Sequence, residues 1–225
     1  MSSQWTKDQV ARTIDHTLLK PDAVEAEIVS LCREAVANRF AAVCVNPIWV
    51  PTCAKHLKNE SVKVATVIGF PLGANCTEIK AKEAQAALQA GAAELDMVLN
   101  VGWAKQGHWD KVQEDIAAVV EEARQYPGAV VKVILETAFL SDDEIVEACH
   151  RSVQAGAEFV KTSTGFGPAG ATVEHVALMR RAVGDRAKVK ASGGIRTAEK
   201  AAQMLSAGAD RLGTSASIAI LNGFA

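Results

Sequence analysis

Apolar and polar positions alternate along the chain in short runs, and stretches of helical composition separate these runs. Eight of the runs are five to eight residues long, most are rich in Val, Ile or Phe, and turn residues close many of them, which is typical of strands. Eight strands that alternate with helices in 225 residues predict one (β/α)8 barrel, or TIM barrel, over residues 1–225. An open doubly wound sheet is the alternative, but the chain has no GxGxxG after its first strand and no GxxxxGK[ST]. The predicted strands cover residues 13–17, 40–46, 62–69, 94–100, 130–136, 159–165, 187–193 and 211–215.

A short repeat supports the alternation of helix and strand. The segments QAGAAELDMV (89–98), QAGAEFVKTS (154–163) and SAGADRLGTS (206–215) each follow a helical pattern. In all three, the glycine falls where the C-cap of a helix needs a positive φ. Ser141 and Thr197 are the expected N-caps of the helices that lead into the second and the third of these segments. The repeated unit is therefore a helix, a glycine and a strand.

The alternation of side chains within a strand places charged residues inside the predicted barrel. In 94–100 the apolar residues share one face, which we expect under the helices, and Asp96 lies on the other face. The repeat puts Lys161 and Gly213 at the position of Asp96, six residues after the alanine that precedes each glycine. Barrel enzymes place their chemistry at the C-terminal ends of the strands, so this layer is the predicted reactive one.

Four inward charges are predicted, and their formal sum is zero: Asp15, Asp96, Lys161 and Lys190. Strand 13–17 is too short for alternation alone to decide which way Asp15 points. Burial of an unpaired charge is unfavourable, so these side chains are expected to pair with one another. One interpretation is a set of ordinary ion pairs that fill the barrel. Two lysines and two acids on central strands favour a reactive site instead.

The chemistry predicted for this site is that of a Schiff base. A free lysine has a pKa of about 10.4 and is protonated at neutral pH, but burial and a nearby positive charge favour the neutral amine. Lys190 is expected to supply that charge to Lys161. The neutral amine of Lys161 would attack a carbonyl, and Asp96 would move protons through a water molecule. This arrangement predicts an aldolase that needs no metal and no other cofactor.

Glycines after the late strands predict a site for a phosphate group. Gly165 follows the sixth strand, Gly193 and Gly194 the seventh, and Gly213 lies in the eighth. Free N–H groups at such turns favour anions, and barrel enzymes often bind phosphate after strands seven and eight. The alternative interpretation is that each glycine only permits a tight turn.

Composition and charge exclude several other classes of protein. The net charge of −2 offers no basic field for nucleic acid or an anionic membrane, and no apolar run approaches the roughly 18 residues of a membrane span. The N-terminal residues lack the apolar core of a signal peptide. The five cysteines form no CxxC pair, and the five histidines form neither HxH nor HExxH, so no disulfide framework or metal site is predicted. A soluble cytoplasmic protein is expected.

Six motifs resemble the deoxyribose-phosphate aldolase family, and together they extend over most of the chain. They are IDHTLLKP (14–21), VCVNP (43–47), ELDMVLNVG (94–102), FVKTSTGFG (159–167), VKASGGIRT (189–197) and RLGTSAS (211–217). The resemblance implies a (β/α)8 class I aldolase, commonly a homodimer. Such an enzyme reversibly cleaves 2-deoxy-D-ribose 5-phosphate to acetaldehyde and D-glyceraldehyde 3-phosphate.

The same motifs imply roles for individual residues. Lys161 matches the lysine that forms the Schiff base, Lys190 the lysine that perturbs it, and Asp96 the acid of the proton relay. Asp15 matches a further acid and Cys44 a cysteine near the site, and the phosphate contacts match Gly165, Gly193, Gly194, Gly213 and Ser215. Thr164, at the end of the lysine's strand, is expected beside the phosphate, so that all eight are candidate substrate-binding residues. The strand faces lead to the two lysines and Asp96 independently of the resemblance.

One feature departs from the family. Some members end in a flexible tail whose terminal tyrosine is thought to help move protons. This chain ends in LNGFA, and its only tyrosine is Tyr126, before the fifth predicted strand. We therefore expect that Asp96 and water suffice, or that turnover is lower.

Two other functions stay open. One is a Schiff-base barrel for another sugar phosphate, similar to a transaldolase, which the use of acetaldehyde as donor would exclude. The other is a barrel that binds a sugar phosphate without catalysis, which borohydride trapping with acetaldehyde would exclude.

Overall fold

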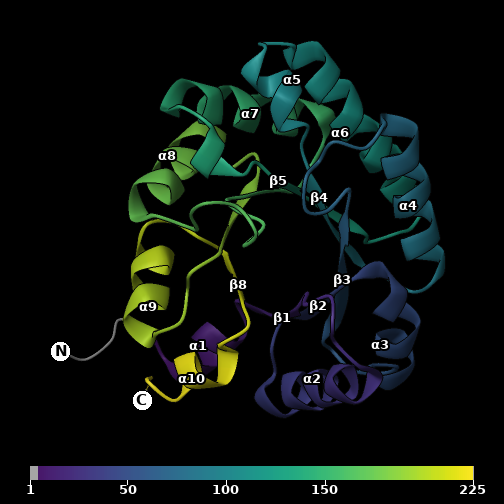
Figure 1. Cartoon of the computed structure of the whole chain (residues 1–225). Helices are drawn as coiled ribbons and strands as arrows, with labels where there is room; N and C mark the ends of the chain where they lie inside the picture. The colour runs from purple at the N-terminus through teal and green to yellow at the C-terminus, as the bar shows by residue number, and fades with distance from the viewer. Residues whose placement is uncertain (1–4, 225) are drawn as a thin grey trace.

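Eight parallel strands close into a barrel in chain order, with helices around it (Figure 1). This computed structural model describes residues 5–224. Residues 1–4 and 225, which the predicted domain 1–225 includes, lie outside the described residues. The predicted (β/α)8 barrel is confirmed, and the open sheet is wrong. The strands are β1 (Ile14–Leu18), β2 (Ala42–Val45), β3 (Lys63–Ile68), β4 (Glu94–Val98), β5 (Val130–Ile134), β6 (Phe159–Lys161), β7 (Lys188–Ser192) and β8 (Arg211–Thr214).

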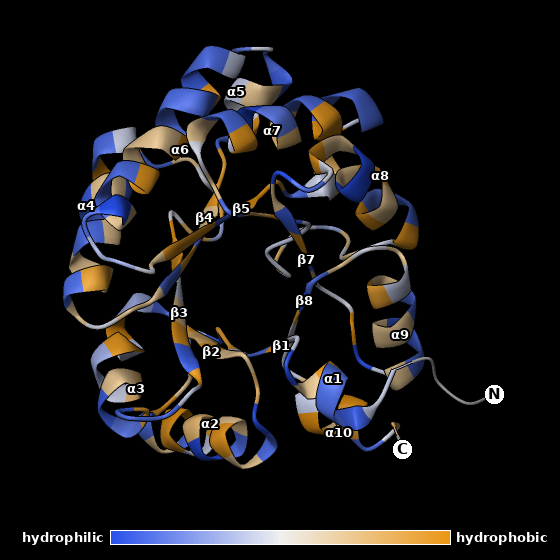
Figure 2. Cartoon of the chain, turned by 180° about the vertical axis from the view of Figure 1, so that it is seen from behind, coloured by the Kyte–Doolittle hydropathy of each residue, from blue (hydrophilic) through white to orange (hydrophobic). Residues whose placement is uncertain are grey.

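The helices form a ring outside the strands and carry hydrophilic as well as hydrophobic residues (Figure 2). The main apolar core lies between this ring and the barrel, where the outward side chains of the strands pack. No helix within residues 5–224 is long and apolar enough to cross a membrane. The α-helices are α1 (Lys7–Ala11), α2 (Glu25–Asn38), α3 (Val50–His56), α4 (Thr77–Gln89), α5 (Val101–Lys105), α6 (Trp109–Arg124), α7 (Asp142–Ala155), α8 (Val173–Val183), α9 (Ala198–Ser206) and α10 (Ser217–Leu221), and the 3-10 helices are η1 (Pro47–Trp49) and η2 (Thr137–Phe139).

The repeat marks helix ends as predicted. Gly91, Gly156 and Gly208 follow α4, α7 and α9 and have φ values between +94° and +109°. A side chain there would be strained, so glycine is the residue that lets each helix stop and turn into its strand. Ser141 caps α7 with the expected capping box, and the side chain of Thr197 caps α9.

The register of the strands defines layers of side chains inside the barrel. In a closed barrel of this kind, side chains at one level come from alternate strands, and the level advances by about one residue per strand. The pairings put Asp96, Lys161 and Gly213 in one layer, as the repeat predicts. From the N-terminal to the C-terminal end of the strands, the layers are Ala42, Glu94, Phe159 and Arg211, then Asp15, Ala65, Lys132 and Lys190, then Cys44, Asp96, Lys161 and Gly213.

Strand β6 is shorter than the predicted strand 159–165. It ends at Lys161 because the side chain of Thr162 takes the place of the backbone ladder with β7. The Thr162 hydroxyl donates to the carbonyl of Ser192 at 3.0 Å, and the Ser192 N–H donates back to the same hydroxyl at 3.0 Å. The residues that follow are then free to form a loop over the end of the barrel.

Candidate active site

A network of seven charged side chains fills the middle of the barrel. The four predicted inward charges belong to it, and so does Glu94 of β4, which the alternation puts on the same face as Asp96. The structure adds Lys132 from β5 and Arg211 from β8. The predicted cancellation of charge is therefore wrong. If all seven groups are ionised, four cations face three carboxylates and leave one positive charge in excess.

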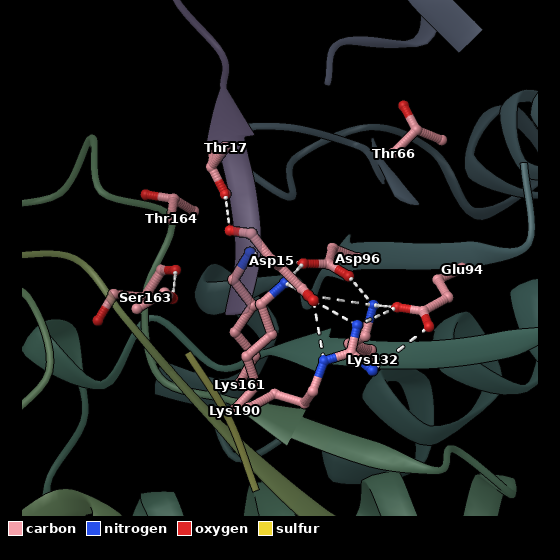
Figure 3. A network of polar contacts seen from close by, with 12 residues as sticks. Asp15, Thr17, Thr66, Glu94, Asp96, Lys132, Lys161, Ser163, Thr164 and Lys190 are labelled. Atoms are coloured by element: carbon pink, nitrogen blue, oxygen red, sulfur yellow. Dashed lines mark hydrogen bonds and ion pairs between the residues drawn. The ribbon is translucent and has the colours of Figure 1, made fainter. Parts of the chain in front are cut away.

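Asp96 is the hub of the network, and three lysines surround it (Figure 3). Its Oδ2 accepts from Lys161 Nζ at 2.7 Å and from Lys190 Nζ at 2.6 Å, and its Oδ1 accepts from Lys132 Nζ at 2.8 Å. Burial alone would raise the pKa of Asp96. The three ammonium groups outweigh burial and hold its pKa well below the usual range.

Asp15 and Glu94 complete the network toward the N-terminal ends of the strands. Asp15 accepts from Lys190 Nζ and, at 2.8 Å, from Arg211 Nε. Burial opposes ionisation of Asp15, but these cations together with Lys132 lower its pKa. Glu94 bonds Lys132 at 2.6 Å and Arg211 at 2.9 Å. Lys132 therefore forms ion pairs with three carboxylates, the one to Asp15 at 3.8 Å, and Lys190 with two.

Lys161 differs from the other two lysines in its carboxylate partners. Its only ion-pair partner within residues 5–224 is Asp96, which it shares with Lys132 and Lys190. Burial lowers the pKa of Lys161, Asp96 opposes this, and the charge of Lys190 lowers it further. Carboxylates raise the pKa of Lys132 and of Lys190 above the ordinary value against the effect of burial. Desolvation is thus a larger cause of the shift at Lys161 than the predicted charge of Lys190.

A pocket of about 240 Å³ opens at the C-terminal ends of the strands, and Lys161, 3% exposed, lies at its floor. Asp15, Cys44, Asp96 and Lys190 are buried beneath the lining, which does not include them. The predicted residues that line the pocket are Lys161, Thr164, Gly165, Gly193, Gly194, Gly213 and Ser215.

The glycine turns of the pocket present backbone N–H groups. Within residues 5–224, the N–H groups of Gly165, Gly193, Gly194 and Ser215 donate to no protein acceptor. The first three have φ between +75° and +87°, and a Cβ on Gly193 would lie 2.9 Å from the Cα of Gly170. Glycine is therefore required at Gly193 for the close approach of two loops. Four amides without acceptors can bind an anion.

Two exposed cations at the pocket were missed by the sequence reasoning. Lys20 follows β1 and Arg196 follows the Gly193–Gly194 pair, and both line the pocket. Both follow predicted strands closely, and the loops at that end of a barrel build its site, so the sequence could have predicted that these two cations border the pocket.

Cys44 lies in the same layer as Asp96 and Lys161, near the charged network, and it also packs against apolar residues. It packs in a small interior cluster with Leu19, Ala42, Ala65 and Val67. Burial raises the pKa of the Cys44 thiol. The predicted contact of this thiol with substrate finds no support in the lining of the pocket.

Comparison with known proteins identifies the family. The family described as DeoC/LacD family aldolase matches residues 9–225. The chain belongs to this aldolase family. A deoxyribose-phosphate aldolase from Carboxydothermus hydrogenoformans is 54% identical over 216 residues, which are 96% of this chain and 95% of that one. Another, from a Thermoanaerobacter species, is 55% identical over 212 residues, 94% of this chain and 95% of the relative.

A solved structure extends the family likeness to three dimensions. The deoxyribose phosphate aldolase from Aeropyrum pernix, described as a unique tetramer, superposes with a TM-score of 0.91 at 37% identity and covers 96% of this chain and 91% of its own. The homodimer expected for the present chain stays a prediction.

Proposed function

We propose that the protein is a class I aldolase that reversibly cleaves 2-deoxy-D-ribose 5-phosphate to acetaldehyde and D-glyceraldehyde 3-phosphate. The observation that carries this proposal is the position of Lys161. It is the one lysine of the buried network that lines the pocket, and its pKa is lowered. The relatives named as deoxyribose-phosphate aldolases support the choice of substrate.

The charge of the network favours a neutral Lys161. With all seven groups ionised, the network has one positive charge in excess, and loss of one proton would balance it. Lys132, Lys190 and Arg211 each contact at least two carboxylates, so Lys161 is the cation that loses least by deprotonation. A neutral amine at the floor of the pocket is the nucleophile that a Schiff base requires.

The reaction follows from this amine. Lys161 Nζ attacks C1 of the open-chain sugar, and loss of water from the carbinolamine forms a protonated imine. The C3 hydroxyl then loses its proton as the C2–C3 bond breaks. The bond's electron pair moves into the imine to form an enamine, and D-glyceraldehyde 3-phosphate leaves. Protonation at C2 and hydrolysis release acetaldehyde and restore Lys161.

The neighbours of Lys161 have separate roles in this proposal. Asp96, whose Oδ2 is 2.7 Å from Lys161 Nζ, is the acid and base that exchanges protons with the site through water. Lys190 stays protonated between two carboxylates and keeps the pKa of Lys161 low. The N–H groups of Gly165, Gly193, Gly194 and Ser215, which also line the pocket, hold the phosphate.

Trapping with borohydride tests the proposal. Wild-type protein incubated with acetaldehyde and sodium borohydride should gain one ethyl group, and peptide mapping should locate it on Lys161. Lys161→Ala should gain none at that position. Absence of the adduct on wild-type protein would overturn the mechanism, and an adduct with dihydroxyacetone but not with acetaldehyde would favour the transaldolase-like alternative.

A further inference from the structure

Glu136 is a buried carboxylate outside the charged network, at the end of β5. Its side chain is 3% exposed, and its backbone is left-handed, with φ 54° and ψ 60°. For a residue with a side chain, this conformation is unfavourable and persists only where the surroundings enforce it. Within residues 5–224, no ion pair joins Glu136 to a basic side chain. Specific contacts of the Glu136 carboxylate must therefore compensate for its burial, its strained backbone and its lack of a basic partner.

A bulge next to the strand of Lys161 enforces the conformation. The Leu135 N–H donates to the carbonyl of Lys161 at 2.9 Å, and the Thr137 N–H donates to the carbonyl of Thr162 at 3.0 Å. Leu135 and Thr137, which are two residues apart at the end of β5, thus bond to consecutive residues at the end of β6. Glu136 is the extra residue between them. Bulges near active sites turn a side chain in a new direction. Here the bulge directs the Glu136 carboxylate onto the loop after β6.

The carboxylate binds one residue of that loop through three contacts. The Thr164 N–H lies 3.3 and 3.2 Å from the two carboxylate oxygens, and the Thr164 hydroxyl donates to Oε2. The same hydroxyl accepts from the Phe166 N–H at 3.0 Å. Gly165 lies between these two residues, so its N–H is fixed on both sides by bonds that lead to Glu136.

The loop also passes directly over the carboxylate. A Cβ on Gly167 would lie 3.0 to 3.1 Å from the carboxylate atoms of Glu136, closer than ordinary contacts. The loop and the acid therefore fit each other at this point. Phe166, between Gly165 and Gly167, lines the pocket of Lys161. It also lines a smaller apolar pocket of about 140 Å³ whose lining includes Glu136.

We propose that Glu136 is a positioning residue that holds the Thr164–Gly165–Phe166 loop in the shape that binds the substrate's phosphate group. The inference rests on the proposed function, because it assigns the Gly165 N–H to the phosphate. Glu136 does not touch the reacting atoms. It acts through Thr164, and its effect falls on phosphorylated substrates and not on the formation of the imine.

The test compares phosphorylated with unphosphorylated substrate. Glu136→Gln keeps the size of the side chain and replaces the charged acceptor. It should raise KM for 2-deoxyribose 5-phosphate about tenfold, since a hydrogen bond to a charged group contributes on that order. The kcat/KM for unphosphorylated 2-deoxyribose and the rate of acetaldehyde trapping should change less than about twofold. The readout is kcat/KM for 2-deoxyribose 5-phosphate divided by kcat/KM for unphosphorylated 2-deoxyribose, and the proposal expects Glu136→Gln to lower this ratio.

Two further variants keep the proposal falsifiable if Glu136→Gln folds poorly. Thr164→Val removes the hydroxyl that links Glu136 to Phe166 and should lower the same ratio. The double variant should lower it no further than the larger single effect, because both act through one contact. Thr137→Val is the matched control. It alters the next residue of the same bulge and removes a buried hydroxyl that has no hydrogen-bond partner, so the ratio should not change.

Each outcome is decisive. An unchanged ratio in both Glu136→Gln and Thr164→Val would overturn the proposal. An equal loss for both sugars would also overturn it, because it would show a purely structural role. Failure of the proposed function would appear differently, as an absence of trapping on wild-type protein.

Discussion

Among the buried pairs of lysine and aspartate within residues 5–224, two are alike in geometry and different in setting. Lys161 bonds Asp96 at 2.7 Å inside the barrel, and Lys80 of α4 bonds Asp115 of α6 at 2.6 Å outside it. All four side chains are at most 4% exposed. Burial lowers the pKa of Lys80 as it lowers that of Lys161, and each aspartate opposes the shift.

The two pairs differ in how the charge of the lysine is satisfied. Within residues 5–224, Lys80 is the only cation that pairs with Asp115, and it also donates to the carbonyl of Val98 at 2.9 Å. Asp115 accepts in addition from the Thr77 hydroxyl at 2.8 Å. Lys161 instead competes for Asp96 with two other ammonium groups and lies at the floor of a pocket. The Lys80–Asp115 pair joins two helices. In the Lys161–Asp96 pair, the charge of Lys161 is only partly balanced, and its side chain borders the pocket.

Burial and a lowered pKa are common to both lysines, so they do not by themselves distinguish the proposed nucleophile from a structural lysine. Structural ion pairs perturb pKa values as well. Competition for a shared carboxylate together with an open pocket separates the two cases, and each can be tested by removing one element at a time.

The largest expected effect is that of Lys161→Met on turnover. Loss of the proposed nucleophile should lower kcat for cleavage of 2-deoxyribose 5-phosphate about a thousandfold or more. Stability should not fall, because Lys161 is the proposed neutral member of the network, and Met leaves Asp96 paired with two ammonium groups. Steady-state kinetics and thermal melting of the same preparation measure both quantities. A large drop in melting temperature would contradict this account of the charge balance.

Lys80→Met should have the opposite profile. It leaves Asp115 buried without its cation, which should lower the free energy of unfolding by about 3–5 kcal/mol. The rate of acetaldehyde trapping per folded molecule should stay at the wild-type value. Urea unfolding and borohydride trapping provide the two measurements. Normal stability with slow trapping would show that the two pairs are not separable as described.

The pattern of the sequence goes far toward this site because a barrel strand alternates strictly. A run such as 94–100 has one apolar face, so the opposite face must carry Asp96 inward, and the repeat transfers this register to Lys161. Lys132 and Arg211 escaped the same reasoning. Lys132 lies in a predicted strand whose faces were not assigned. Arg211 lies two residues before Gly213, on the face that the repeat turns inward, but the predicted inward charges did not include it.

Other parts of the site depend on contacts that no local pattern contains. Lys80 occupies an ordinary helical position, and only the packing of α4 against α6 brings it to Asp115. Glu136 follows a strand, but its role depends on the offset of one residue between β5 and β6. Bulges and pairs between helices are long-range features, so sequence reasoning finds the strands that carry the site before it finds what supports them.

The effect of Lys190 on Lys161 gives the third prediction, which concerns pH. The rate of imine formation should rise with pH as Lys161 loses its proton and level off above its pKa. Lys190→Leu removes a positive charge next to Lys161 and leaves Asp96 more available to it, and both changes raise the pKa of Lys161. The rising limb should therefore move to higher pH, and the rate near pH 7 should fall about ten- to a hundredfold. Trapping rates across pH give the profile.

Lys188→Met is the matched control for that experiment. Lys188 lies on the same strand, two residues before Lys190, but it is exposed and its Nζ lies 5.7 Å from the ring centre of Phe159 at the other end of the barrel. Removal of this charge should leave the pH profile in place. If Lys188→Met moved the limb as far as Lys190→Leu, the net charge of the protein would be responsible and not the neighbour of Lys161.

The smallest expected effect lies at the rim of the pocket, where a charge is exposed and not buried. Lys20 lines the pocket from the loop after β1 and is open to solvent, so its attraction for a phosphate group is weak and screened by salt. Lys20→Ala should raise KM for 2-deoxyribose 5-phosphate about two- to fivefold at low ionic strength, and the difference from wild type should fade at about 0.5 M salt.

Lys58→Ala is the control and should leave KM unchanged. It removes an exposed lysine from the turn between α3 and β3, at the other end of the barrel. An effect of Lys20→Ala that salt does not diminish would mean that Lys20 binds the phosphate at close range in a desolvated contact. Lys20 would then act in the way of the buried lysines, and exposure at the rim of the pocket would not distinguish it from Lys161 at the floor.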